Sequence, residues 1–230
     1  MYLSRLTLNA RSAMVRKDLT DCRRMHRTIM SAFPVCEGDA RAAYRILHRI
    51  ETLPRSNTLT MLVQSEMEPR WADLPKNYLA MGHEPEVKGI DQSLAGIRRG
   101  MVLNFRLRAN PTKKVDTKSG PDAKRRNGRR KKLQGEQEQV GWLLRKASSG
   151  GFAVLDVRRT EEAGEVGSTS RIADSTEPYE QVQMFFGSVL FDGTLQVTDA
   201  ERFRKTLADG LGSGKAFGFG LLSVALRAMR

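Results

Sequence analysis

The chain is short of cysteine and has no long apolar segment. Its two cysteines, Cys22 and Cys36, are too few for a disulfide framework and predict a reducing compartment. No run of about 18 consecutive apolar residues is present, so no membrane-spanning helix is expected. Arg5, Asn9 and Arg11 interrupt the first residues, which therefore lack the apolar core of a signal peptide. The expected location is the cytoplasm.

Histidine is also scarce, and the histidines and cysteines lack the spacing of a metal site. His26, His48 and His83 are scattered, whereas zinc ligands come in closely spaced pairs. His48 follows an apolar run in a predicted strand, and His83 lies in a Gly/Pro segment. Both are expected to be structural or incidental, and neither a metal nor another cofactor is expected.

Acidic residues are the minority charge, and the basic excess is concentrated in one segment. The chain has 39 Lys and Arg against 26 Asp and Glu, a net charge of +13. Residues 113–132 hold ten Lys and Arg and two Asp, which gives this segment +8 of that total. A solubility surface would spread its charge, so the clustering favours a polyanion such as nucleic acid. A solvated loop that binds polyanions nonspecifically is the alternative.

The strand that leads into this basic arm carries arginines. Residues 101–110 alternate between apolar and polar, the period of a strand with one buried and one open face. Arg106, Arg108 and Asn110 occupy the polar positions. The sequence therefore predicts an open arginine face continued by a basic arm, whose low apolar content is typical of a segment that orders on binding.

The order of predicted elements repeats. Residues 1–85 contain a β-α-β-β-α-β order and residues 99–230 repeat it, with a Gly/Pro-containing linker over 86–98. Strands are predicted at 2–9, 43–50, 58–65, 78–80, 101–110, 152–157, 182–186, 189–197 and 216–226. The segment 189–197 is expected to turn at Asp192-Gly193, a hairpin signal. Helices are predicted at 18–33, near 68–71, at 136–146 and from 200 to 209, and a polar loop at 160–177. The fold class is α+β, with two tandem ferredoxin-like (RRM-like) domains.

Four stretches together resemble the CasE (Cse) endoribonucleases of type I-E CRISPR systems. They are residues 1–9, the Asp-Leu at 18–19 with Met-His-Arg-Thr-Ile at 25–29, residues 63–65 with Glu-Pro-Arg-Trp at 68–71, and Phe-Arg-Leu-Arg-Ala-Asn-Pro at 105–111 with the glycine-rich run at 210–222. The resemblance implies two ferredoxin-like domains that face each other across a cleft. It also implies cleavage of CRISPR precursor RNA at the base of the repeat hairpin, and retention of the product with other Cascade subunits. The free protein is expected to be a monomer.

His26 is the residue on which the chemistry depends. By position it lies about 50° beside the apolar stripe of its helix, where a histidine is ordinarily a packed residue. The resemblance implies instead that His26 is catalytic, because the family's catalytic histidine lies in this motif. A histidine can accept the proton of a 2′-hydroxyl that attacks the adjacent phosphate, and no metal is needed for this step. The products would be a 2′,3′-cyclic phosphate and a 5′-hydroxyl.

Arg23 stands where some relatives have a tyrosine, three residues before the histidine. An arginine cannot act as a base, but it can hold the phosphate and stabilise its developing charge. Arg23 is therefore the predicted second catalytic residue. An ordinary solvated helix charge is the alternative for Arg23 and also for Arg27, which is predicted to bind RNA.

The glycine-rich run has two interpretations. It is either a tight helix-to-strand turn or a loop beside the RNA, in which small residues let the backbone approach the phosphates and Lys215 reaches one of them. The full set of predicted RNA-binding residues is Arg27, Arg106, Arg108, Asn110, Lys113, Lys114, Lys124, Arg125, Arg126, Arg129, Arg130, Gly212, Gly214 and Lys215. Two functions compete with the endoribonuclease: a noncatalytic hairpin-RNA-binding subunit, and a basic structural protein of a ribonucleoprotein particle.

Overall fold

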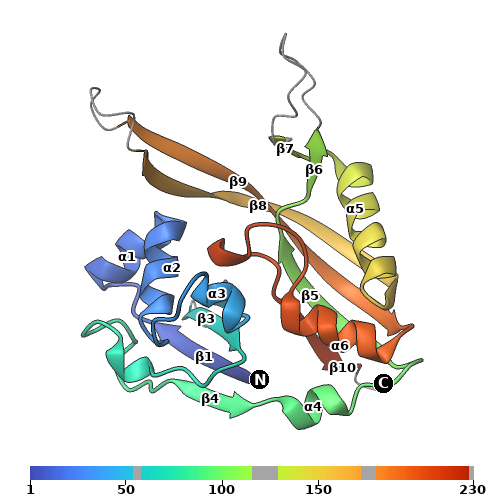
Figure 1. Cartoon of the computed structure of the whole chain (residues 1–230), viewed down its shortest axis with the longest axis horizontal. Coiled ribbons are helices and arrows are strands. Elements are labelled where there is room, and N and C mark those ends of the chain that lie inside the picture. The colour runs from blue at the N-terminus through green and yellow to red at the C-terminus, as the bar shows by residue number, and fades with distance from the viewer. Residues whose placement is uncertain (54–57, 116–128, 172–179, 228–230) are drawn as a thin grey trace.

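The first half of the chain forms a four-stranded antiparallel sheet. The computed structural model describes residues 1–53, 58–115, 129–171 and 180–227. The strands of this sheet lie in the order β2-β3-β1-β4 (Figure 1). They are β1 (Tyr2–Leu8), β2 (Leu47–Leu53), β3 (Thr58–Ser65) and β4 (Glu86–Gly89). Because β1 pairs with β3 from Tyr2–Ser65 to Leu8–Leu59, its alternating side chains share one buried face with those of β3.

Three helices and one 3₁₀ turn accompany this sheet. They are α1 (Ala13–Leu19), α2 (Cys22–Met30), α3 (Ala40–Ala43) and η1 (Trp71–Asp73). The helix predicted over 18–33 is wrong in its bounds, since Asp21 takes an extended conformation and its side chain accepts a hydrogen bond from the Arg23 amide. This cap starts α2 anew, and the stripe of Met25 and Ile29 then packs on the sheet.

The second half forms another four-stranded antiparallel sheet in the order β10-β5-β9-β8. Its strands are β5 (Val102–Ala109), β8 (Phe152–Arg171), β9 (Glu180–Val197) and β10 (Leu222–Leu226). The helices α5 (Glu136–Ser149) and α6 (Ala200–Asp209) and the 3₁₀ turn η2 (Lys215–Phe217) belong to this half. The ends of the basic arm form a separate pair, β6 (Thr112–Val115) and β7 (Arg129–Lys132).

The loop predicted at 160–177 and the turn predicted at Asp192-Gly193 are both wrong in the described residues. β8 and β9 run as one long antiparallel pair that passes over α1 and α2 (Figure 1). Gly193 lies inside β9, where a Cβ would be 2.0 Å from the Asp156 carbonyl oxygen. The glycine therefore permits a close backbone approach beside a bulge in β8 and does not form a turn. The sequence predicts a loop because the polar outer part of β8 lacks the one-sided alternation that identifies a strand.

Other differences from the predicted elements are smaller. Residues 86–98 contain β4, which pairs with β1, and α4 (Asp91–Ala95), so this segment is structured where a linker was expected. The edge strand predicted at 78–80 is reduced to a bridge between Leu8 and Leu79. The strand predicted from 43 begins at Leu47, and the one predicted from 216 begins at Leu222. The domain boundaries at 85 and 99 stay predictions.

Two side chains of the first sheet bind the second half. The buried Arg49 of β2 donates from Nη1 to the carbonyl oxygens of Leu221 (2.9 Å) and Arg106 (3.3 Å), and from Nη2 to Ser223 Oγ (3.0 Å). Gln64 donates to the Leu207 carbonyl at 2.8 Å. These bonds tie β2 and β3 to β5, β10 and α6, which fixes how the two sheets meet.

Candidate active site

The fold brings the His26 helix and the glycine-rich segment together. His26 lies on α2, and its ring meets the Phe217 ring edge-on, with centroids 6.2 Å apart and an interplanar angle of 76°. Phe217 ends η2, which contacts α2 and β2 and lies beside α2 in Figure 1. Residues almost 200 positions apart in sequence therefore form one site, as the resemblance carried by the four stretches implies.

The glycine-rich segment, residues 210–220, has a fixed shape. Its backbone is closed by hydrogen bonds from the Leu211 amide to the Gly220 carbonyl (2.9 Å) and from the Gly220 amide to the Arg108 carbonyl (2.8 Å). Gly218 and Gly220 have φ angles of +85° and +89°, which side-chain-bearing residues rarely adopt. The segment is thus both a tight turn and a loop next to His26.

The surroundings of His26 keep its imidazole neutral. Burial, and then the positive charge of Arg41, lower the pKa of His26, with Arg23 acting in the same direction and Asp39 opposing them. A neutral imidazole can accept a proton at neutral pH. The pKa of Lys215 is also lowered, first by burial and then by Arg41. Arg41 therefore acts electrostatically on both groups.

Arg41 was not among the predicted site residues. It lies on α3, which begins where the Asp39 side chain accepts a hydrogen bond from the Ala42 amide at 3.1 Å. The Arg41 side chain is 19% exposed and lies 3.7 Å from the Asp39 carboxylate. Its four-residue helix carries no recognisable motif, so only the tertiary structure reveals its place beside His26.

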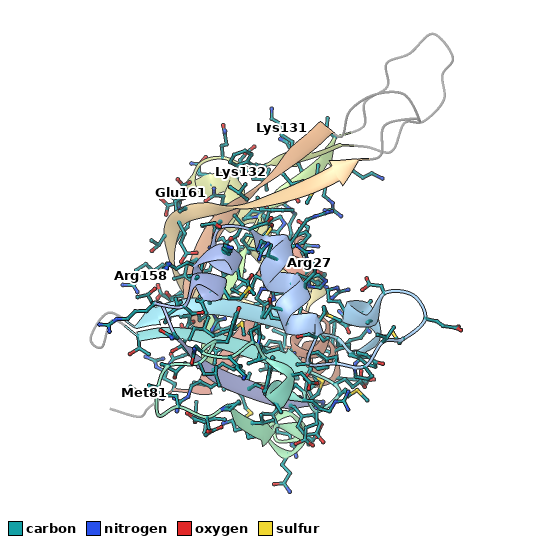
Figure 2. The ribbon with its side chains drawn as sticks, turned by 90° about the vertical axis from the view of Figure 1, so that its left-hand side faces the viewer. Arg27, Met81, Lys131, Lys132, Arg158 and Glu161 are labelled. Carbon is teal, nitrogen blue, oxygen red and sulfur yellow. The ribbon has the colours of Figure 1, made fainter. Side chains whose placement is uncertain are left out.

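Arg23 and Arg27 lie one turn apart on α2 and differ in exposure. Arg23 is half-buried against β8, since a Cβ on Gly167 would lie 3.5 Å from Arg23 Cγ. Arg27 is exposed, and Figure 2 shows it on α2 with Lys131 and Lys132 above it on β7. Arg23 thus lies next to the long β8–β9 pair, while Arg27 is open to a ligand.

The arginine face predicted on β5 is only partly open, since the Arg106 side chain is 41% exposed. A cavity of about 520 Å³ lies between the two sheets, and Arg106 and Arg108 line it together with His48. Arg106 pairs with Asp192 (2.6 Å) and Glu51 (3.5 Å). The Arg108 side chain is 13% exposed and pairs with two glutamates at 2.7 Å. The polar face of β5 points into the cavity, where carboxylates from β2, β8 and β9 neutralise it.

Asn110 pairs with the glycine-rich segment, and Gly212 and Gly214 within that segment pack inward. Asn110 is 6% exposed and forms a β-bridge with Ser213. A Cβ on Gly212 would lie 2.8 Å from the Trp142 ring, and one on Gly214 would lie 2.9 Å from the Phe219 ring. These three residues pack against the protein and present no free side chain to a ligand. Their RNA-binding role stays a prediction.

The basic arm presents the remaining predicted cations. Lys113, Lys114 and Arg130 are exposed on β6 and β7, and Lys113 lies 3.4 Å from the Glu138 carboxylate on α5. Lys124, Arg125 and Arg126 lie outside the described residues, and Arg129 is described only in its backbone as part of β7. In Figure 1 the β6–β7 pair stands at the end of α5, apart from α2.

Among the described residues, no group of three or more His, Cys, Asp or Glu side chains is placed to hold a metal ion. No helix of that same part of the chain is long and apolar enough to cross a membrane. Cys22 and Cys36 are free thiols. His48 is buried at the floor of the cavity, and His83 is exposed.

Fold and site together define a class of protein. It is an α+β protein with two ferredoxin-like halves, in which a neutral histidine on α2 lies against a glycine-rich segment. The model of the CRISPR associated protein family matches residues 1–225. The chain belongs to this family.

Individual relatives agree with the family assignment. The chain is 35% identical over 229 residues to the CRISPR-associated endoribonuclease Cse3 of Thermus thermophilus, covering 98% of this chain and 100% of the relative. It is 33% identical over 136 residues to the Cascade subunit CasE of Escherichia coli, covering 55% and 59%. A solved structure of the CRISPR endoribonuclease Cse3 bound to 19 nt RNA superposes with a TM-score of 0.76 at 33% identity, covering 98% and 100%. The predicted fold class is thereby confirmed.

Proposed function

We propose that this protein is a metal-independent endoribonuclease that cleaves CRISPR precursor RNA at the base of the repeat hairpin and keeps the product as a Cascade subunit in the cytoplasm. One observation carries the proposal: the neutral, half-buried His26 lies against the glycine-rich segment, with the positive charges of Arg23 and Arg41 acting on it. Family membership supports the substrate class, because a relative along the full chain is named a CRISPR-associated endoribonuclease and a similar solved structure is bound to RNA.

The reaction is a transesterification of the RNA. His26 accepts the proton of the 2′-hydroxyl, whose oxygen attacks the adjacent phosphorus in line and expels the 5′-oxygen of the next nucleotide. The leaving oxygen takes up a proton, and the products are a 2′,3′-cyclic phosphate and a 5′-hydroxyl. The negative charge that develops on the phosphorane can be stabilised by Lys215, Arg41 and Arg23. Fixed cations in a half-buried site stabilise such charge effectively, because they need little reorganisation during the reaction.

The RNA hairpin is expected to bind across α2 and the basic arm. The arm and Arg27 supply positive charge on exposed surfaces, whereas Arg106 and Arg108 are paired with carboxylates of the protein itself. The phosphates should therefore meet Arg27, Lys113, Lys114 and Arg130 before they meet the cavity. Backbone contacts of this kind dominate the recognition of an RNA duplex.

A noncatalytic hairpin-binding subunit is the second candidate, because Arg23 replaces the tyrosine found in some relatives. The two are separated by incubating a 5′-labelled repeat hairpin with wild-type protein and with His26→Ala in EDTA. Cleavage by the wild type alone, with a 2′,3′-cyclic phosphate on the 5′ fragment, supports the endoribonuclease. Tight binding of the hairpin without cleavage by either protein would establish the noncatalytic subunit instead.

A further inference from the structure

We propose that Arg108 is a positioning residue, which holds the glycine-rich segment against His26 and does not itself bind RNA. This inference rests on the proposed function, because it concerns how the same site is assembled. It assigns a role to a half-buried ion-pair cluster that the reaction itself does not use: Arg108 of β5, Glu162 and Glu165 of β8, and Ser188 of β9. These four residues are called the Arg108 cluster.

Arg108 contacts the segment at three successive places. Its carbonyl oxygen accepts a hydrogen bond from the Gly220 amide at 2.8 Å. Its guanidinium carbon lies 5.2 Å from the centroid of the Phe219 ring, within the range of a cation–π contact. A Cβ on Gly218 would lie 3.6 Å from Arg108 Nη1. The end of the segment next to η2 therefore rests directly on this one residue.

The guanidinium is in turn fixed by three acceptors. Nε donates to Glu162 Oε2 at 2.7 Å and to Ser188 Oγ at 3.0 Å, and Nη1 donates to Glu165 Oε1 at 2.7 Å. Ser188 Oγ donates to the same Glu162 oxygen at 2.8 Å, which closes the network. A charge-assisted fork of this kind restrains the side chain in both distance and direction.

An irregularity of β8 builds this cluster. Residues three apart on a regular strand point to opposite faces, yet Glu162 and Glu165 both reach Arg108. The register of β8 against β9 shifts between these two residues, and a Cβ on the intervening Gly164 would lie 2.5 Å from the Phe186 carbonyl oxygen. The shift aims both carboxylates at one guanidinium, which is a common use of a bulge near a functional site.

His48 completes the floor under the segment. The residue is 3% exposed, and its Nε2 would lie 3.4 Å from a Cβ on Gly218. From Gly218 the chain leads to Phe217, whose ring meets both His26 (6.2 Å) and Phe186 (4.9 Å). A continuous path of contacts thus runs from the Arg108 cluster to the catalytic histidine.

The same geometry argues against direct RNA contact by Arg108. Its side chain is 13% exposed, and two carboxylates already balance its charge. A phosphate could reach it only by displacing a glutamate and separating half-buried ion pairs, which is unfavourable. Loss of Arg108 should therefore alter the rate of the chemical step and leave the affinity for RNA almost unchanged.

The test compares Arg108→Ala and Arg108→Lys with Arg159→Ala. Arg159 is a matched control on β8, since its side chain is 20% exposed and bonds Glu161 and Gln139 at 2.9 and 2.7 Å. Three quantities are measured well below each variant's Tm: the single-turnover cleavage rate at saturating protein, the Kd for a hairpin with a 2′-deoxy scissile nucleotide, and amide hydrogen exchange of residues 211–220.

Arg108→Ala should lower the saturated rate about 10²-fold, the loss expected from a displacement of about 1 Å in a catalytic site. Its Kd should change less than about 2-fold, since an interaction that acts on the chemical step alone leaves ground-state binding unchanged. Exchange of residues 211–220 should rise. Arg108→Lys, which keeps the charge but not the fork, should fall between wild type and Arg108→Ala, and Arg159→Ala should match the wild type.

Several outcomes would overturn the inference. A weaker Kd with an unchanged saturated rate would make Arg108 an RNA contact, and a lowered Tm with unchanged rate and exchange would leave it a purely structural residue. Unchanged exchange in residues 211–220 would contradict the positioning role even if the rate falls. Wild-type protein that binds the hairpin without cleaving it would contradict the proposed function instead, and the exchange measurement would still decide the positioning role.

Discussion

Replacing Gly220 with alanine separates backbone strain from the arrangement of the active site. Gly220 has a φ of +89°, and a Cβ there would lie 2.7 Å from the Leu211 carbonyl oxygen, a backbone atom. Gly100 is a matched control, because it has the same φ of +89° and nothing lies within 4 Å of the position of its Cβ. The left-handed conformation costs an L-residue about 1–2 kcal/mol, which corresponds to a fall in Tm of roughly 2–8 °C for a chain of this size.

Both variants should therefore lose stability, but only Gly220→Ala should also displace the segment that meets His26. We expect its saturated single-turnover rate to fall about 10²-fold at a temperature where both variants are folded, with hairpin binding retained. Gly100→Ala should cleave at the wild-type rate. Equal rates for the two variants would refute the argument that the closure of the segment at Leu211 and Gly220 arranges the site.

Three further results are expected. His26→Ala should lose about 10²–10⁴-fold in cleavage rate, the usual contribution of a general acid or base, with hairpin binding preserved in a gel-shift assay; cleavage at the normal rate would contradict the assignment. Arg41→Ala should move the acid limb of the pH–rate profile to higher pH, because Arg41 lowers the pKa of His26, and its loss makes imidazole protonate at a higher pH; an unmoved limb would place Arg41 away from the reaction. The last of the three comes from neutralising five residues of the arm: Lys124, Arg125, Arg126, Arg129 and Arg130. The slope of log Kd against log salt concentration should fall by up to about 0.9 for each lost phosphate contact, by analogy with B-DNA. An unchanged slope would assign the arm to another role.

The sequence predicts best where one face of an element is buried and the other is open. The alternation in β5 and the apolar stripe of α2 follow directly from burial on the core, as Leu107 and Ile29 show. The repeated order of elements then leads to the two ferredoxin-like halves. The meeting of α2 with the glycine-rich segment followed from the resemblance, because no periodicity within either segment relates it to the other.

Tertiary contacts account for what the sequence could not predict. A polar position on a strand is either solvated or neutralised by another element, and the local pattern is the same in both cases. Arg108 is neutralised by residues 54 and 57 positions further along the chain. Arg41 acts on His26 through space from a short helix, so no spacing rule connects the two residues. The outer part of β8 was missed because its two faces are similarly polar.

Product retention follows from where the unpaired positive charge lies. The two arginines of the cavity, Arg106 and Arg108, are paired with carboxylates, while the arm and α2 carry exposed cations. Binding energy should therefore come mainly from phosphates of the hairpin stem. Cutting one bond at the base of the stem removes almost none of those contacts, and the affinity for product should nearly equal the affinity for substrate. With RNA in excess, cleavage should therefore stop near one equivalent of product per protein in a quench-flow time course. Steady multiple turnover would show that affinity depends on the intact strand, and would move the main contacts from the arm to both sides of the scissile phosphate.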